Sequence, residues 1–268
     1  MPRLNRPDGA EIHWEQRGEG ETIVITPHAW GIPELFEPLI RDLERDHRVI
    51  RYDARGTGES SRRGPHDMQT GAADLTAVVD DAGGPALAVG IADAPNRAIR
   101  SAVDRRDLIS GVVAVASAPI GLSELRGTDA LVSSSIVLDA FIEQLATDYR
   151  GAMRPLLSVA NPQSSEQEIR ERIDTQVAYV PQDVLVERIR AWKDDEPGEI
   201  GKALGERLWL LTSPDTAGPW FPSPETLNDV LRRLLPEAHR VAVEDGIVTR
   251  PELTATVVRG ITGRDGAG

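Results

Sequence analysis

Residues 87–94 (LAVGIADA) constrain the fold of this chain more than any other stretch. A short apolar run reaches Gly90, a turn of small residues follows, and residues 96–103 have helical character. This order is typical of a strand-to-helix elbow, the sharp turn that carries a nucleophilic serine in Gly-x-Ser-x-Gly motifs. The nucleophile position here holds Ala92. The stretch therefore predicts a fold and leaves the reaction open.

The register of this turn decides which residue occupies the nucleophile position. The strand and helix backbones approach closely at an elbow, so small residues are needed two positions before and two after its apex. Centring the turn on Ala92 places Gly90 and Ala94 at those positions, whereas centring it on Asp93 places isoleucine and proline there. The sequence therefore favours Ala92 at the apex over Asp93 as an aspartate nucleophile.

Strand-like and helix-like segments alternate around the elbow. Buried apolar runs that predict strands lie at residues 22–26, 49–52, 86–89 and 111–116, and helical spacing of apolar residues marks residues 34–44, 72–81 and 96–103. Short connections between such segments imply right-handed crossovers and a parallel sheet. Two strand-like pieces around Pro7-Asp8-Gly9 add an antiparallel hairpin at one edge.

The alternation stops after Ala118. Residues 134–149, 165–178 and 182–193 are helical stretches with no convincing strand among them, which indicates an inserted helical cap. Strand signals return at residues 208–212 and 240–243, and helical signals at 224–235 and 251–261. We predict an α/β core of residues 1–119 and 206–268, a mostly parallel central sheet flanked by helices, with a cap of residues 120–205.

Composition narrows the partners. The net charge of −13 disfavours nucleic acid and anionic membrane surfaces, and the chain has no cysteine and so no thiolate nucleophile or sulfur-ligated metal. No apolar run approaches the roughly 18 residues that cross a bilayer, and residues 1–8 are too polar for a signal peptide. We expect a cytoplasmic protein with a small-molecule partner and no nucleic-acid or membrane partner; its oligomeric state stays open.

A glycine-rich loop at residues 53–60 (DARGTGES) contains a Gly-x-Gly spacing. The third glycine and the immediate helix of a phosphate-binding loop are both missing. We therefore expect no cofactor, and we expect no metal.

The order of these pieces resembles the α/β-hydrolase superfamily over roughly residues 9–261. The resemblance rests on residues 27–31 (PHAWG) at the oxyanion-loop position, on residues 51–60 (RYDARGTGES) after the next strand, and on residues 89–118, which match the elbow strand, elbow, helix and following strand without a gap. It implies the α/β-hydrolase fold with an inserted helical cap.

The resemblance breaks at two positions of the catalytic triad. The acid of the superfamily usually follows the strand at residues 208–212, which corresponds to Asp215, but Ile247 or Val248 stands where its histidine would fall. Ala92 replaces the nucleophile. Since a serine must pass its proton to an imidazole, we expect an atypical member that is not a Ser-His-Asp esterase.

The leading hypothesis is a small-molecule enzyme that uses non-covalent acid/base chemistry, such as a lyase, an epoxide-opening enzyme, a cyclase or another non-hydrolytic enzyme of secondary metabolism. Its catalytic candidates are Asp93, His28, His66 and Asp215. Each has a structural alternative: Asp93 as a charge at a helix N-terminus, His28 as a brace of the oxyanion loop, Asp215 as a cap of the strand end, and His66 as a surface residue.

Residues that line a pocket are predicted around the same elbow. The binding candidates are Trp30, Ala29, Ala92, Trp220 and Phe221, and the aromatic side chains suggest a flat or apolar ligand. Two other functions stay open. One is a catalytically inactive pseudo-hydrolase that binds a ligand or stabilises a partner, and the other is an atypical hydrolase in which Asp93 or Asp215 acts as general base for water.

Overall fold

The sheet confirms the predicted mostly parallel architecture. The computed structural model describes residues 2–29, 36–125, 128, 130–161, 163–212, 223–243 and 250–265. Its sheet has the order β1-β2-β4-β3-β5-β6-β7-β8, in which β1 pairs with β2 and β2 with β4 antiparallel while all other neighbours are parallel. The strands are β1 (Arg3–Asn5), β2 (Glu11–Arg17), β3 (Glu21–Thr26), β4 (His47–Tyr52), β5 (Ala86–Ile91), β6 (Ile109–Val115), β7 (Leu208–Thr212) and β8 (His239–Ala242).

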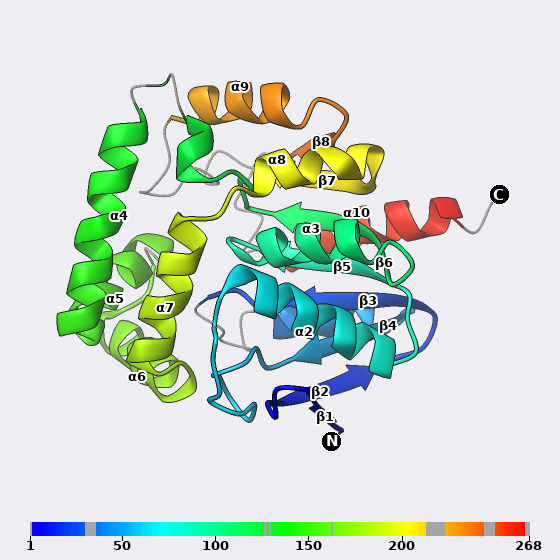
Figure 1. The fold of residues 1–268 in the computed structure, drawn as a ribbon, viewed down its shortest axis with the longest axis horizontal. Helices are drawn as coiled ribbons and strands as arrows, with labels where there is room; N and C mark the ends of the chain where they lie inside the picture. The colour runs from blue at the N-terminus through cyan, green and yellow to red at the C-terminus, as the bar shows by residue number, and fades with distance from the viewer. Residues whose placement is uncertain are drawn as a thin grey trace.

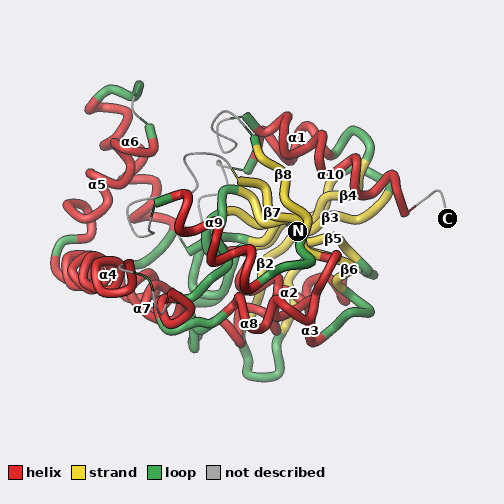
Figure 2. The backbone as a smooth tube through the Cα atoms, turned by 90° about the horizontal axis from the view of Figure 1, so that it is seen from above, coloured by secondary structure: helices red, strands yellow, loops and turns green. Residues whose placement is uncertain are grey.

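Helices cover both faces of this sheet (Figures 1 and 2). One face carries α1 (Glu37–Leu43) and α10 (Pro251–Asp265), and the other carries α2 (Met68–Asp81), α3 (Ala94–Asp104), α8 (Pro197–Gly201) and α9 (Pro224–Leu234). Short 3₁₀ helices lie at η2 (Leu122–Leu125) and η3 (Lys202–Arg207). The described helices thus form two layers around a central sheet.

Strand β5 shows why the sheet must be covered on both faces. Ala86 and Ala88 pack into the hydrophobic cluster beneath α2 and α3, while Leu87 and Val89 pack into the cluster beneath α1 and α10. Successive side chains of a strand point to opposite faces. A strand that is apolar at every position is therefore stable only between two helical layers.

A third hydrophobic cluster lies beside the sheet, among α4 (Ala130–Thr147), α5 (Tyr149–Ala160), α6 (Glu166–Tyr179) and α7 (Gln182–Lys193). Figure 1 shows these four helices, the α4–α7 cluster, as a separate group at one side of the core. They correspond to the predicted cap, whose boundaries at residues 120 and 205 stay a prediction. Sequence reasoning missed α5, because Gly151 and Pro155 both disfavour a helix interior.

The described helices were compared with the length and apolar character that crossing a bilayer requires. None of these helices combines the length and the apolar character that a membrane span requires.

Candidate functional site

The elbow after β5 has the strained geometry that the sequence predicts. Ala92 has φ 56°, a left-handed conformation that costs a non-glycine residue roughly 1 kcal/mol or more. A Cβ atom added at Gly90 would lie 2.9 Å from the backbone nitrogen of Pro95 and 3.0 Å from the Cβ atom of Ala94. This close approach confirms that Ala92 occupies the apex of the turn and that glycine is required two positions before it.

Ser117, which sequence reasoning missed, braces the elbow from the next strand. Its Oγ donates a hydrogen bond to the carbonyl oxygen of Ala92, and the side chain is buried. Ala116 before it has φ 44°. The available signal was a polar residue directly after buried strand β6, because adjacent parallel strands end at the same edge of a sheet. The hydroxyl is committed to the carbonyl and holds the turn in place.

Asp93 is buried and has both carboxylate oxygens engaged. Oδ1 accepts the backbone N–H of Ala29 at 2.8 Å, and Oδ2 accepts Nη1 of Arg97 at 2.7 Å. Burial opposes ionisation, but the charge of Arg97, aided by His28 and the Ala29 N–H, keeps the pKa of Asp93 below its ordinary value. Asp93 is therefore an ionised carboxylate that links the elbow to the loop after β3. This position favours a structural role for Asp93 over proton transfer.

His28 lies in the same loop with its ring buried. The ring centroid stands 5.5 Å from that of Phe36 at an interplanar angle of 53°. Burial lowers the pKa of His28 to about 4; Asp93 opposes this shift, whereas Arg188 and Arg97 add to it. The imidazole is neutral at pH 7, which suits a residue that braces the loop.

His66 enters the contact between the core and α7. Its backbone N–H donates to Oε1 of Glu187 at 3.0 Å, and its Nδ1 lies 2.8 Å from Oε2 of the same carboxylate. A Cβ atom added at Gly56 would lie 2.6 Å from Nε2 of His66. The glycine-rich loop thus leaves space for the His66 ring. The side chain of His66 is 7% exposed, so it does not lie on the surface.

A pocket lined by residues of α2, α3 and α7 brings His66 together with two buried arginines. Arg97 comes from α3 and Arg188 from α7, and the lining also includes Tyr52, Ala54, Arg55, Pro65, Asp67, Gly71 and Asp74. It holds about 310 Å³ of empty space, counting solvent at its mouth. Sequence reasoning missed Arg97 and Arg188. Arg188 follows the buried Val184 and Leu185 at helical spacing, which places it on the inner face of α7.

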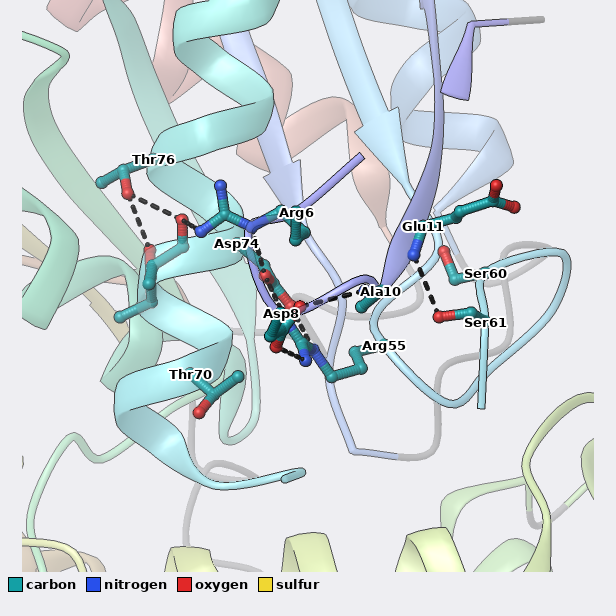
Figure 3. A network of polar contacts seen from close by, with 12 residues as sticks. Arg6, Asp8, Ala10, Glu11, Arg55, Ser60, Ser61, Thr70, Asp74 and Thr76 are labelled. Carbon is teal, nitrogen blue, oxygen red and sulfur yellow. Dashed lines mark hydrogen bonds and ion pairs between the residues drawn. The ribbon is translucent and has the colours of Figure 1, made fainter. Parts of the chain in front are cut away.

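Arg55 lines this pocket within a fully paired network (Figure 3). Its Nε and Nη2 each donate to Asp74 at 2.9 Å, and its Nη1 donates to Asp8. Arg6 donates to the same Asp74 at 2.9 Å. These contacts fix the hairpin turn before β2 and the glycine-rich loop onto α2.

Four predicted site residues cannot be placed. Trp30, Asp215, Trp220 and Phe221 lie outside the described residues, as do Ile247 and Val248. Of the remaining binding candidates, Ala29 is buried under the α4–α7 cluster and Ala92 is partly buried at the elbow. Within the part of the chain that the structure describes, no group of three or more His, Asp or Glu side chains could hold a metal ion.

Comparison with known proteins identifies the architecture. No protein-family model matches the chain. It is 29% identical over 139 residues to a pimeloyl-[acyl-carrier protein] methyl ester esterase of Aliivibrio salmonicida, covering 52% of this chain and 51% of that protein. It is 38% identical over 82 residues to a non-heme haloperoxidase of Rhodococcus erythropolis, covering 30% of each chain. The chain thus spans at most about half the length of these curated relatives.

Among solved structures, an esterase from Exiguobacterium antarcticum superposes with a TM-score of 0.78 at 18% identity, covering 97% of this chain and 98% of that one. The esterase names correct one expectation of the sequence. A lyase, epoxide-opening enzyme, cyclase or other non-hydrolytic enzyme is the wrong expectation, because the matching proteins include a methyl ester esterase and a second esterase. Fold analogy at this identity extends to architecture alone. This chain has the α/β-hydrolase fold.

Proposed function

We propose that this chain is a small-molecule hydrolase in which water, and not residue 92, attacks the substrate. The observation that carries the proposal is the elbow itself: Ala92 stands at the strained apex with φ 56° and offers only a methyl group. The esterases among its relatives support hydrolysis as the reaction class. The triad is degenerate in this proposal, and no acyl-enzyme forms.

The attack needs a base and a site for the developing oxyanion. Water adds to the substrate carbonyl carbon and gives its proton to a carboxylate; the tetrahedral intermediate then expels the alcohol, which takes up that proton. The backbone N–H of Asp93, next to the apex, occupies the position that stabilises an oxyanion in elbows of this kind. Both side-chain oxygens of Asp93 are engaged. We therefore assign the base to Asp215.

Turnover of a panel of small methyl esters, carbamates and lactones tests this function. We expect slow hydrolysis by the wild-type chain, a loss of at least about 100-fold in kcat for Asp215→Asn, and no gain for Ala92→Ser, because a serine there lacks a histidine. Glu225→Gln, an exposed carboxylate at the start of α9, is the matched control and keeps the wild-type rate. Rapid turnover by Ala92→Ser, or no turnover of any substrate by the wild type, contradicts the proposal.

A specific observation favours a second candidate, a protein that binds a ligand without turnover. The elbow lacks a hydroxyl at residue 92, and the one carboxylate described beside it, Asp93, is tied to Arg97 and Ala29. Saturable binding of a panel member with no product after prolonged incubation would select this function over hydrolysis.

A further inference from the structure

The pocket lined by α3 and α7 contains a buried cation, Arg188, that forms no ion pair with any described carboxylate. Arg188 is 2% exposed, and Nη1 donates to the carbonyl oxygen of Ala29 at 3.3 Å. Among the described residues, no carboxylate oxygen lies within 4.0 Å of its guanidinium nitrogens. A buried guanidinium without a counter-ion pays a desolvation penalty of several kcal/mol.

Arg97 offers a second donor to the same pocket. Its Nη1 is used by Asp93, but its Nη2 is buried and has no hydrogen-bond partner among the described residues. The side chain is 3% exposed and packs against Gly71 of α2, where an added Cβ would lie 2.8 Å from Cδ of Arg97. Arg97 therefore has a fixed position, and one N–H group of its fork is unused.

His66 supplies a third group at the pocket wall. Glu187 holds its Nδ1, while Nε2 is buried without a partner among the described residues. In an imidazolium ring both nitrogen atoms are hydrogen-bond donors. Three side chains from separate parts of the chain thus bring unused polar atoms to one pocket: α3, α7 and the loop before α2.

The acidic residues of the pocket do not fill this role. Asp74 is engaged by Arg55 and Arg6, and Asp67 caps α2 by accepting the backbone N–H of Thr70 at 2.6 Å. Neither forms an ion pair with Arg97 or Arg188. Among the described residues, no other carboxylate therefore supplies a counter-charge for these donors.

We propose that this pocket binds a small oxyanion, the carboxylate or phosphate group of a small molecule, through Arg97, Arg188 and His66. Guanidinium groups suit both chemistries, because their N–H forks match carboxylate and phosphate oxygens. The inference is independent of hydrolysis, since it concerns binding alone.

Calorimetric titration of the full chain with inorganic phosphate, and separately with propionate, tests the site. Sodium chloride at matched ionic strength and neutral propionamide are the controls. We expect saturable binding of at least one of the two anions, and the tighter of the two identifies the oxyanion class. Arg188→Met is expected to weaken that binding by at least about tenfold, because a hydrogen bond to a charged group is lost. Arg190→Met, an exposed arginine on the same helix, keeps the wild-type affinity.

An NMR titration of the wild-type chain tests the same site without a variant, in case Arg188→Met does not fold. In the wild-type chain, the side-chain N–H signals of the buried arginines are expected to shift during the phosphate or propionate titration, while the signals of exposed arginines stay unchanged. The inference is overturned if neither anion binds saturably, if Arg188→Met binds as tightly as the wild type, or if only exposed arginines respond.

Discussion

Two arginine clusters meet at one pocket and differ in how their charges are satisfied. In the first, which we call the closed cluster, Arg55 and Arg6 share Asp74, and Asp8 takes a further N–H of Arg55. In the second, the open cluster, Arg97 and Arg188 lie near Asp93, and of the two arginines Asp93 forms an ion pair with Arg97. Arg55 and Asp74 of the closed cluster are buried, as are Arg97 and Arg188 of the open cluster, whereas Arg6 and Asp8 are partly exposed. A buried cation whose donors are all used holds elements together, whereas a buried cation with unused donors requires a separate explanation.

The largest effect is expected when the closed cluster is broken. Asp74, which is 1% exposed, carries the negative charge that Arg55 and Arg6 share. Asp74→Asn removes this charge and leaves both arginines without it. We expect the free energy of unfolding to fall by about 3 kcal/mol or more, measured by urea unfolding.

The matched control for this variant is Asp229→Asn, in the exposed ion pair with Arg232 on α9. That substitution is expected to change the free energy of unfolding by less than about 0.5 kcal/mol. Equal losses for the two variants would show that the closed cluster is no more structural than a surface pair.

An intermediate effect is expected from pH, because His28 reports on the open cluster. Its pKa is about 4 in the folded chain and 6.5 as the ordinary value, so between these pH values the unfolded chain binds more protons. Stability therefore rises with pH across that window and is lost as pH falls from 6.5 toward 4. The contribution of His28 is at most between about 3 and 4 kcal/mol.

Urea unfolding at several pH values, on the wild-type chain and on His28→Gln, measures this dependence. The variant is expected to have a shallower slope between pH 6.5 and 4. In Arg188→Met, the pKa of His28 in a ring-proton NMR titration is expected to rise, because Arg188 is one of the cations that lower it. An unchanged slope and an unchanged pKa would show that the open cluster does not act on His28.

The smallest effect is expected from the open cluster itself. Arg188→Met, without added anion, replaces an uncompensated buried charge with an apolar chain of similar length. We expect the free energy of unfolding to stay within about 1 kcal/mol of the wild type, in contrast to Asp74→Asn. A loss as large as that of Asp74→Asn would remove the distinction between the clusters.

Sequence patterns predicted the sheet and the elbow because each depends on local features. Apolar runs such as β5 and small residues such as Gly90 report burial and close approach directly. The polar site depends on contacts between distant segments. Asp93 is tied to Ala29, and Arg97 and Arg188 meet across separate helices. No spacing within one segment encodes those meetings, and Asp93 therefore resembled a candidate base in the sequence.

The glycine at residue 56 has a mechanical consequence for access to the pocket. Its Cβ position would lie 2.6 Å from Nε2 of His66 and 2.8 Å from Cγ1 of Val184 on α7. A methyl group there would collide with His66, which lines the pocket, and with Val184 on α7. The absence of a side chain at residue 56 thus allows α7 of the α4–α7 cluster to pack closely against the glycine-rich loop.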